Sequence, residues 1–292
     1  MSAQIPEFFS DPLTAAGLMV LVAQAGAYSL YWFLGDRAHR ERAMEGFERV
    51  LISGVLFGIA LILVNLSLWG LNIYLSIVDV KLPHNSAIQV LNRTEGWWDF
   101  GSNVQAALRI AEGTYRSYTT ASGAILGAYA TAVVATGLTH WTAPVSMAIL
   151  NVLAFLVTAA TTVLILSAVY AVAMTLAHTW PLLLPLGAVM VTYERTRQLG
   201  AWLLSVSVVA PIILAAGADL LASAVEAEKL RAIANLDIIQ IITSLPAIIA
   251  KQIIDSLLVA MIVLGLIGLS LGVLTYAASR LFDHAGASLS LD

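Results

Sequence analysis

The residues able to do acid–base or metal chemistry are few and lie far apart in the chain. No cysteine occurs among the 292 residues, which excludes thiolate catalysis, iron–sulfur clusters and thiolate zinc sites. The sequence also lacks the HExxH metalloprotease motif and the Walker A phosphate loop. His140 and His178 flank one long apolar segment near its opposite ends, so a straight helix keeps them from sharing a haem iron. We therefore expect no enzyme activity, no catalytic residue, no metal and no cofactor.

The elements that carry these residues are apolar helices. The chain is 60% apolar and only 11% charged, against about 25% charged residues in an average soluble domain. A helix crosses the hydrocarbon core of a bilayer with about 20 apolar residues. Five stretches carry no charge at all: residues 12–35, 50–78, 117–193, 198–218 and 256–279. This pattern predicts one all-α, polytopic integral membrane domain over residues 1–292.

The uncharged stretch 117–193 is too long for one crossing and contains two breaks. Trp141 to Pro144 and His178 to Pro181 place tryptophan and proline where a helix ends. Spans are therefore expected over 119–138 and 144–177. Residues 182–193 are short for a span, and we favour a thin crossing, for about seven transmembrane helices in total. The alternative is six helices plus a re-entrant segment.

Tryptophans and glycines indicate how these helices sit and pack. Tryptophan near a helix end is typical of the membrane interface. Five are predicted as interfacial anchors: Trp32, Trp69, Trp141, Trp180 and Trp202. GxxxG pairs allow helices to approach closely, within one chain or between chains. Three such pairs are predicted as packing sites: Gly54/Gly58, Gly123/Gly127 and Gly268/Gly272.

The segments between the spans are short. Residues 36–49, predicted as a cytoplasmic loop, alternate in sign, with Arg37/Glu41 and Glu45/Arg49 spaced as i,i+4 pairs, and predict a solvated helical extension of the first two spans. Residues 79–116 predict an external loop with an amphipathic helix from about Ser102 to Arg116, whose apolar face is expected on the outer membrane surface or on a neighbouring subunit. Residues 219–255 predict an external interfacial segment. Amphipathic external helices therefore belong to the predicted fold.

Arginine density predicts the orientation. Half of the 14 basic residues fall in short segments on one side: Arg37, Arg40, Arg42, Arg49, Arg195, Arg197 and Arg280. The positive-inside rule weights short loops most heavily. We therefore expect a multi-pass protein of the cell membrane with its N-terminus outside and its C-terminus in the cytoplasm.

The middles of all the predicted spans carry no charge. Ion-coupled transporters usually place ionisable residues at that depth. This disfavours a proton pump or a carrier of charged solutes, and leaves a passive conduit or a scaffold among membrane lipids.

One stretch resembles a known family. Residues 180–214, WPLLLPLGAVMVTYERTRQLGAWLLSVSVVAPIIL, combine a proline-broken apolar piece, an arginine-bearing turn and a new span. They resemble archaeal CedA-type DNA-import membrane proteins, which are similar to TrbL-type subunits of conjugation and type IV secretion systems. The resemblance implies a homo-oligomeric channel subunit through which DNA passes, with a separate membrane-associated ATPase and small membrane subunits as partners. It implies no catalytic residues.

An oligomer would gather Arg195 and Arg197 into a ring at the cytoplasmic mouth of the pore. Two other classes of function stay open. One is a structural or anchoring membrane subunit of a respiratory or secretion complex, and the other is a permease for a neutral solute.

Overall fold

The computed structural model describes residues 12–78, 86–91, 100–137, 143–225 and 250–289, and every regular element in them is a helix. The elements, in order, are α2 (Pro12–Leu34), α3 (Arg37–Val78), α4 (Ala87–Leu91), α5 (Phe100–Gly137), α6 (Ala143–His178), α7 (Trp180–Val191), η2 (Glu194–Thr196), α8 (Arg197–Ala224) and α11 (Ala250–Leu289). Five of these helices contain stretches long and apolar enough to cross a membrane. The predicted all-α polytopic membrane protein is therefore confirmed.

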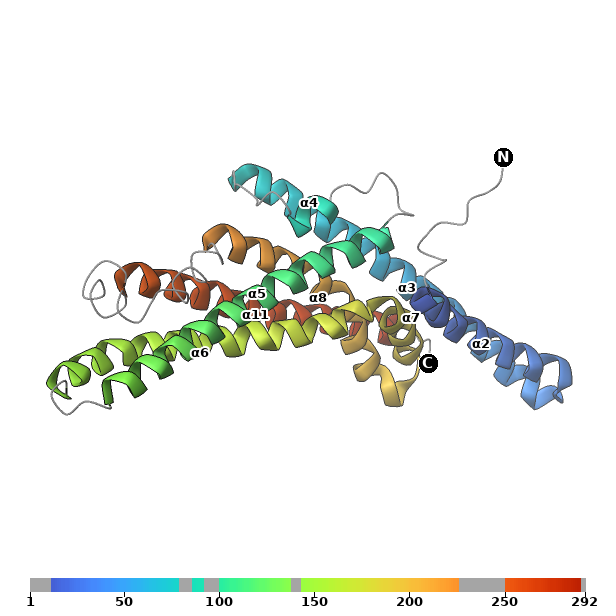
Figure 1. Ribbon diagram of the computed structural model, residues 1–292. Coiled ribbons are helices and arrows are strands. Elements are labelled where there is room, and N and C mark those ends of the chain that lie inside the picture. Colours follow the sequence, from blue (N-terminus) through green and yellow to red (C-terminus); the bar gives the residue numbers. More distant parts are fainter. Residues whose placement is uncertain (1–11, 79–85, 92–99, 138–142, 226–249, 290–292) are drawn as a thin grey trace.

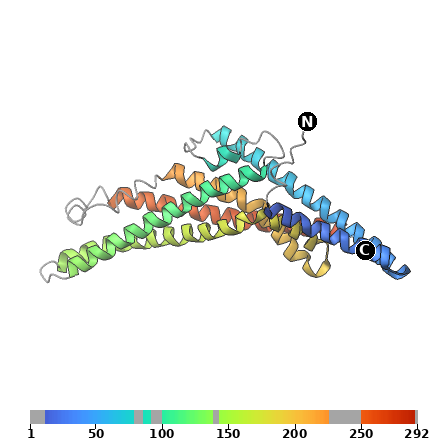
Figure 2. The same cartoon turned by 45° about the vertical axis from the view of Figure 1, so that its right-hand side comes forward.

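The long helices run roughly along one direction and meet in a central region formed by α7, α8 and α11 (Figure 1). The α2–α3 hairpin projects at one end and the α5–α6 hairpin at the other. Figure 2 shows that the α2–α3 hairpin leaves the central region at an angle. Each hairpin is only one helix layer thick over its outer part. Large apolar side chains stay exposed on α2, α3 and α6 of these hairpins, and also on α11. Such faces suit contact with lipid.

Helix α3 contains the charged segment 36–49 almost entirely, as predicted. Asp36 precedes the helix, and its carboxylate accepts a hydrogen bond from the backbone N–H of His39 at 3.0 Å, which caps the first turn. Arg37 and Glu41 form the expected i,i+4 pair at 3.6 Å. Arg49 makes no such pair with Glu45; its guanidinium lies 5.4 Å from the ring centre of Tyr193 instead. Arg49 thus contacts Tyr193 in place of Glu45, and this contact joins α3 to the turn after α7.

Helix α5 differs from its prediction. The amphipathic helix expected at the membrane surface and the span expected at 119–138 are one continuous helix of 38 residues. Its apolar face is almost fully buried, with Val104, Leu108, Ala111 and Tyr115 between 0% and 2% exposed. Helix α5 contacts α4, α6 and α8 inside the protein. The pattern of one apolar face was read correctly, but its partner is protein and not lipid.

Helix α7 has 12 residues, about 18 Å in length, and is shorter than the hydrocarbon core. It covers most of residues 182–193 and packs antiparallel on the first half of α8. A Cβ added to Gly200 would lie 2.5 Å from the backbone nitrogen of Val191, and one added to Gly187 would lie 2.9 Å from that of Leu204. These glycines allow the two backbones to touch. At this length α7 is not among the five helices of the described part that are long enough to cross a membrane.

The predicted anchors and glycine pairs fall in different environments. Trp32 and Trp202 are 39% and 48% exposed, whereas Trp180 is buried at 1% because the α6–α7 break lies inside the bundle. Trp69 lies in α3 without a described side chain, and Trp141 and residues 226–249 lie outside the described part. Gly268 faces the Tyr170 hydroxyl closely, and Gly123 has ordinary contact with Leu164. A Cβ would meet no described neighbour within 4 Å at four positions: Gly54, Gly58, Gly127 and Gly272.

Candidate functional site

The structure gathers four polar side chains where α6 ends against α5. His178 Nδ1 lies 2.8 Å from Gln105 Oε1, and His178 Nε2 lies 3.3 Å from Glu112 Oε2. Glu112 also pairs with Arg116, with Oε1 and Nη2 2.6 Å apart. Gln105 Nε2 donates to the backbone carbonyl of His178 at 3.0 Å. We call Gln105, Glu112, Arg116 and His178 the polar cluster.

Helix geometry explains why these residues meet. Gln105, Glu112 and Arg116 are spaced i, i+7 and i+11, so they share one face of α5. His178 is the last residue of α6, where the carbonyl groups have no partner within the helix. Pro181 follows at the start of α7, so the chain cannot continue the same helix. The helix break thus supplies both the imidazole and a free carbonyl to α5.

Tyr115, the residue before Arg116, joins α5 to the buried interior of the bundle. Its hydroxyl donates to Leu214 O of α8 at 2.9 Å, and its ring lies 5.5 Å from that of Tyr170 on α6. Tyr170 in turn donates to Leu264 O of α11 at 2.6 Å. Tyr170, Leu214 and Leu264 each lie within six residues, or about 9 Å, of the middle of their candidate spans.

The polar cluster lies beside this buried interior, at the helix break where the candidate span Val157–His178 ends. Its charged members, Glu112 and Arg116, lie outside the uncharged stretches, so the expectation that the span middles carry no charge stays a prediction. The charges come from residues 100–116, which were assigned to an external loop. Ionisable groups are costly in hydrocarbon and are usual on ion and substrate pathways.

The polar cluster combines a carboxylate, a guanidinium and an imidazole. The Glu112 carboxylate lies between the Arg116 guanidinium and the His178 ring, and the side chains of Glu112 and His178 are only 21% and 24% exposed. Both ring nitrogens of His178 face oxygen atoms. Arg116 is 70% exposed and keeps most of its guanidinium free for an anion. Among the described residues, no three His, Cys, Asp or Glu side chains form a group that could hold a metal.

Other candidate residues serve to hold the fold together. Asp219 is 2% exposed and accepts bonds from Ser86 Oγ at 2.6 Å, Ala87 N at 2.9 Å and Ile88 N at 2.7 Å. It therefore caps the short helix α4. The pentapeptide Gly268 to Gly272 has GxSxG spacing, but it lies inside α11 and not at the strand-to-helix turn that a serine nucleophile needs.

The predicted pore-mouth arginines lie at one end of the bundle. Arg195 is exposed in η2 and Arg197 begins α8. The neighbouring Tyr193 hydroxyl lies 3.0 Å from that of Tyr28 and accepts from Gln24 Nε2 at 3.3 Å. Together with Arg49 over the Tyr193 ring, these contacts bring segment 36–49 and the 194–197 turn to the same end of the molecule.

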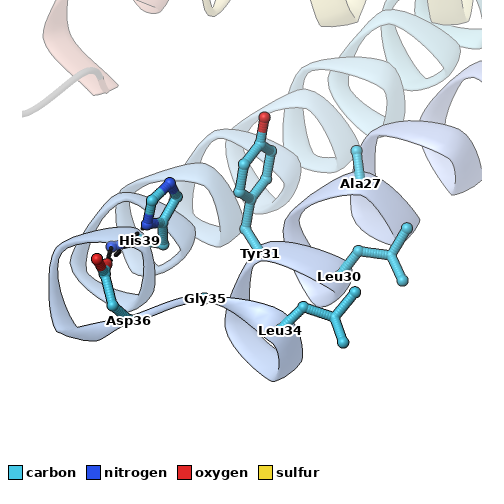
Figure 3. Close-up of a pocket in the computed structure, with 7 residues that line it drawn as sticks. All are labelled: Ala27, Leu30, Tyr31, Leu34, Gly35, Asp36 and His39. Atoms are coloured by element: carbon cyan, nitrogen blue, oxygen red, sulfur yellow. Dashed lines mark hydrogen bonds and ion pairs between the residues drawn. The ribbon is translucent and has the colours of Figure 1, made fainter.

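A hollow at the tip of the α2–α3 hairpin is lined by Ala27, Leu30, Tyr31, Leu34, Gly35, Asp36 and His39 (Figure 3). His39 Nδ1 lies 2.7 Å from Asp36 Oδ1, and hydrogen bonds from the His39 backbone and ring lower the pKa of this exposed carboxyl. The His39 ring stacks on Tyr31 with centroids 6.0 Å apart. These contacts close the hairpin turn, and the hollow is remote from the polar cluster.

Comparisons with family models, curated protein sequences and solved structures find no match for this chain. Function is therefore argued from the site itself. The polar cluster was missed from sequence because its charges and its histidine belong to segments 66 or more residues apart. The one usable signal was the i, i+7, i+11 spacing of polar residues on a helix whose other face is apolar.

Proposed function

We propose that this chain is a membrane-embedded channel subunit of a DNA-transfer machine, a passive conduit driven by a separate ATPase. The observation that carries the proposal is the polar cluster between the helices, where α6 breaks and the short helix α7 begins. Broken helices and ionisable groups among apolar helices are typical of membrane pathways and are tolerated where they line water or are covered by protein. The motif-level resemblance of residues 180–214 supports DNA as the cargo.

In this proposal the chain works as a homo-oligomer in the cell membrane, with its N-terminus outside and its C-terminus in the cytoplasm. The arginine-rich end, with Arg49, Arg195 and Arg197, forms the cytoplasmic mouth. The ATPase and the small membrane subunits are separate chains that bind to this one. The chain itself supplies no catalytic group.

The test combines purification with a DNA-uptake assay in the native host. We expect the purified chain to form a ring of several copies with an ATPase that co-purifies. Deleting the chain should abolish DNA uptake, and the Arg195→Ala/Arg197→Ala double variant should lower uptake while leaving the ring intact. Substituting the exposed Arg37, at the hairpin tip, by alanine is the matched control and should leave uptake unchanged.

Two results would point elsewhere. Normal DNA uptake after deletion, with cofactor-bearing chains co-purifying, would identify a structural or anchoring subunit. A lone monomer that binds a small neutral ligand saturably would identify a permease.

A further inference from the structure

The outward face of α5 differs from the outward faces of the other long helices. On α6 the exposed positions near mid-depth carry Ile165, Val169, Val172 and Leu176, each between 53% and 66% exposed. Helices α2, α3 and α11 likewise expose large apolar side chains along their length. Among the α5 side chains that the structure describes, Val134 near the end of the helix is the one exposed large apolar side chain.

The exposed positions of α5 before Val134 instead carry arginine, threonine, glycine and alanine. Seven of them follow one another at intervals of three or four residues and therefore form a single stripe: Arg109, Gly113, Arg116, Thr120, Ala124, Gly127 and Thr131. We call this set the α5 stripe. A Cβ placed on Gly113 or Gly127 would meet no described neighbour within 4 Å, so the stripe is open on its outer side. From Arg109 to Thr131 it rises about 33 Å, close to the thickness of the hydrocarbon core.

Lipid is a poor environment for this face. Helix α5 is not among the five helices of the described part that are apolar enough to cross a membrane, and the Arg116 side chain is 70% exposed. A charged side chain in the hydrocarbon of a bilayer is strongly disfavoured. Glu112 offsets part of the charge of Arg116, but Arg109 adds a second cation on the same stripe. The stripe therefore needs water on its outer side.

Resting on the proposed function, we infer that the α5 stripe lines the aqueous pathway between copies of this chain and contacts a polyanionic cargo. Guanidinium groups pair with phosphate oxygens through two parallel hydrogen bonds. The small and hydroxyl-bearing positions beyond Arg116 leave room for a polymer and offer no strong binding. Glu112 keeps Arg116 partly neutralised, which favours passage over retention because each full phosphate contact adds to affinity.

The absence of native cysteine allows a direct test on the full assembled chain in membranes. Thr120→Cys and Ala124→Cys place a thiol of similar size on the stripe. Val169→Cys, on the exposed face of α6 beside Tyr170, is the control at similar depth facing lipid. Ser122→Cys is the buried control on α5 itself, where the native side chain is 0% exposed.

Each single-cysteine chain is treated with a charged, membrane-impermeant thiol reagent. An apolar environment raises a thiol's pKa, and each pKa unit lowers the reactive thiolate about tenfold. We expect Thr120→Cys and Ala124→Cys to react at least about tenfold faster than Val169→Cys and Ser122→Cys. Equal rates at the stripe and at Val169→Cys would overturn the inference.

DNA transfer after labelling separates this inference from the proposed function. Fast labelling of the stripe that lowers DNA transfer supports both. Fast labelling in a chain whose deletion leaves DNA transfer normal keeps the aqueous face and removes the DNA function. Slow labelling in a chain that is required for DNA transfer removes the aqueous face and leaves the conduit with another lining.

Discussion

At the scale of single residues, the chemistry of this protein depends on which charge meets which partner. Glu112 and Arg116 have i,i+4 spacing in the sequence, and the structure pairs them. The structure adds His178 as a second partner, 66 residues away. No local pattern contains this contact, because it depends on where α6 ends relative to α5. Glu112 is thereby a partly buried link between two helices.

Replacing Glu112 by glutamine should destabilise the protein by about 1–3 kcal/mol, because Arg116 and His178 then lose their shared anion in a partly buried site. The expected loss in melting temperature is about 2–4 °C for each kcal/mol in a chain of this size. Thermal unfolding of the purified protein in detergent measures it. Glu41→Gln, whose native side chain is 72% exposed, is the matched control and should shift the melting temperature by less. Equal shifts for the two variants would argue against a link through Glu112.

At the scale of elements, glycine spacing in the sequence and helix contact in the structure do not coincide. A Cβ added to Gly54 or Gly58, which form a GxxxG pair, would meet no described atom within 4 Å. Gly187 and Gly200 belong to no such pair, yet they let the backbones of α7 and α8 touch. A glycine permits close approach, but the facing helix decides whether approach occurs. The short α7 depends on this contact because 12 residues offer little helix stability of their own.

Gly200→Ala tests the α7–α8 contact. The added methyl group would lie 2.5 Å from Val191 N, and backbone atoms cannot move away as a flexible side chain can. We expect a loss of about 1–3 kcal/mol in the free energy of unfolding. Gly54→Ala is the control, since its methyl group meets no described atom within 4 Å and alanine favours the helix. Denaturant titration of both variants checks this, and a neutral Gly200→Ala variant would contradict the close packing.

At the scale of the whole molecule, the structure shows which arginine-bearing segments lie near each other. From the sequence, they could be assigned to one side only by counting arginines. Contacts around Tyr193 bring segment 36–49 and the 194–197 turn to one end. The far end of α8, near Ser223, lies at the opposite end of that helix (Figure 1). Five candidate spans between these ends make the protein a multi-pass membrane protein.

Labelling of single cysteines in sealed vesicles should reveal this arrangement. Arg42→Cys and Arg195→Cys are expected to react with an impermeant thiol reagent from the same side of the membrane. Ser223→Cys, an exposed position near the other end of α8, should react from the opposite side. Reaction of Arg42→Cys and Arg195→Cys from different sides would contradict the contact between α3 and Tyr193.

The amino-acid sequence by itself determined the class of this protein. Charge-free apolar stretches of 20 residues or more are typical of membrane spans. In the bilayer such a stretch forms a helix, because no water is present to satisfy its backbone polar groups. The helical extension at 37–49 and the break at His178 follow from equally local rules of charge spacing and proline geometry.

Only the tertiary structure decided where the charged start of α5 lies. An amphipathic pattern states that one face avoids water, but lipid and protein satisfy that face equally well. Val104, Leu108 and Tyr115 are buried inside the protein, where α5 contacts α4, α6 and α8, and this packing places Glu112 beside His178. The position of α5 depends on the sum of contacts between segments that are distant in the sequence, and a short window of sequence does not include these contacts.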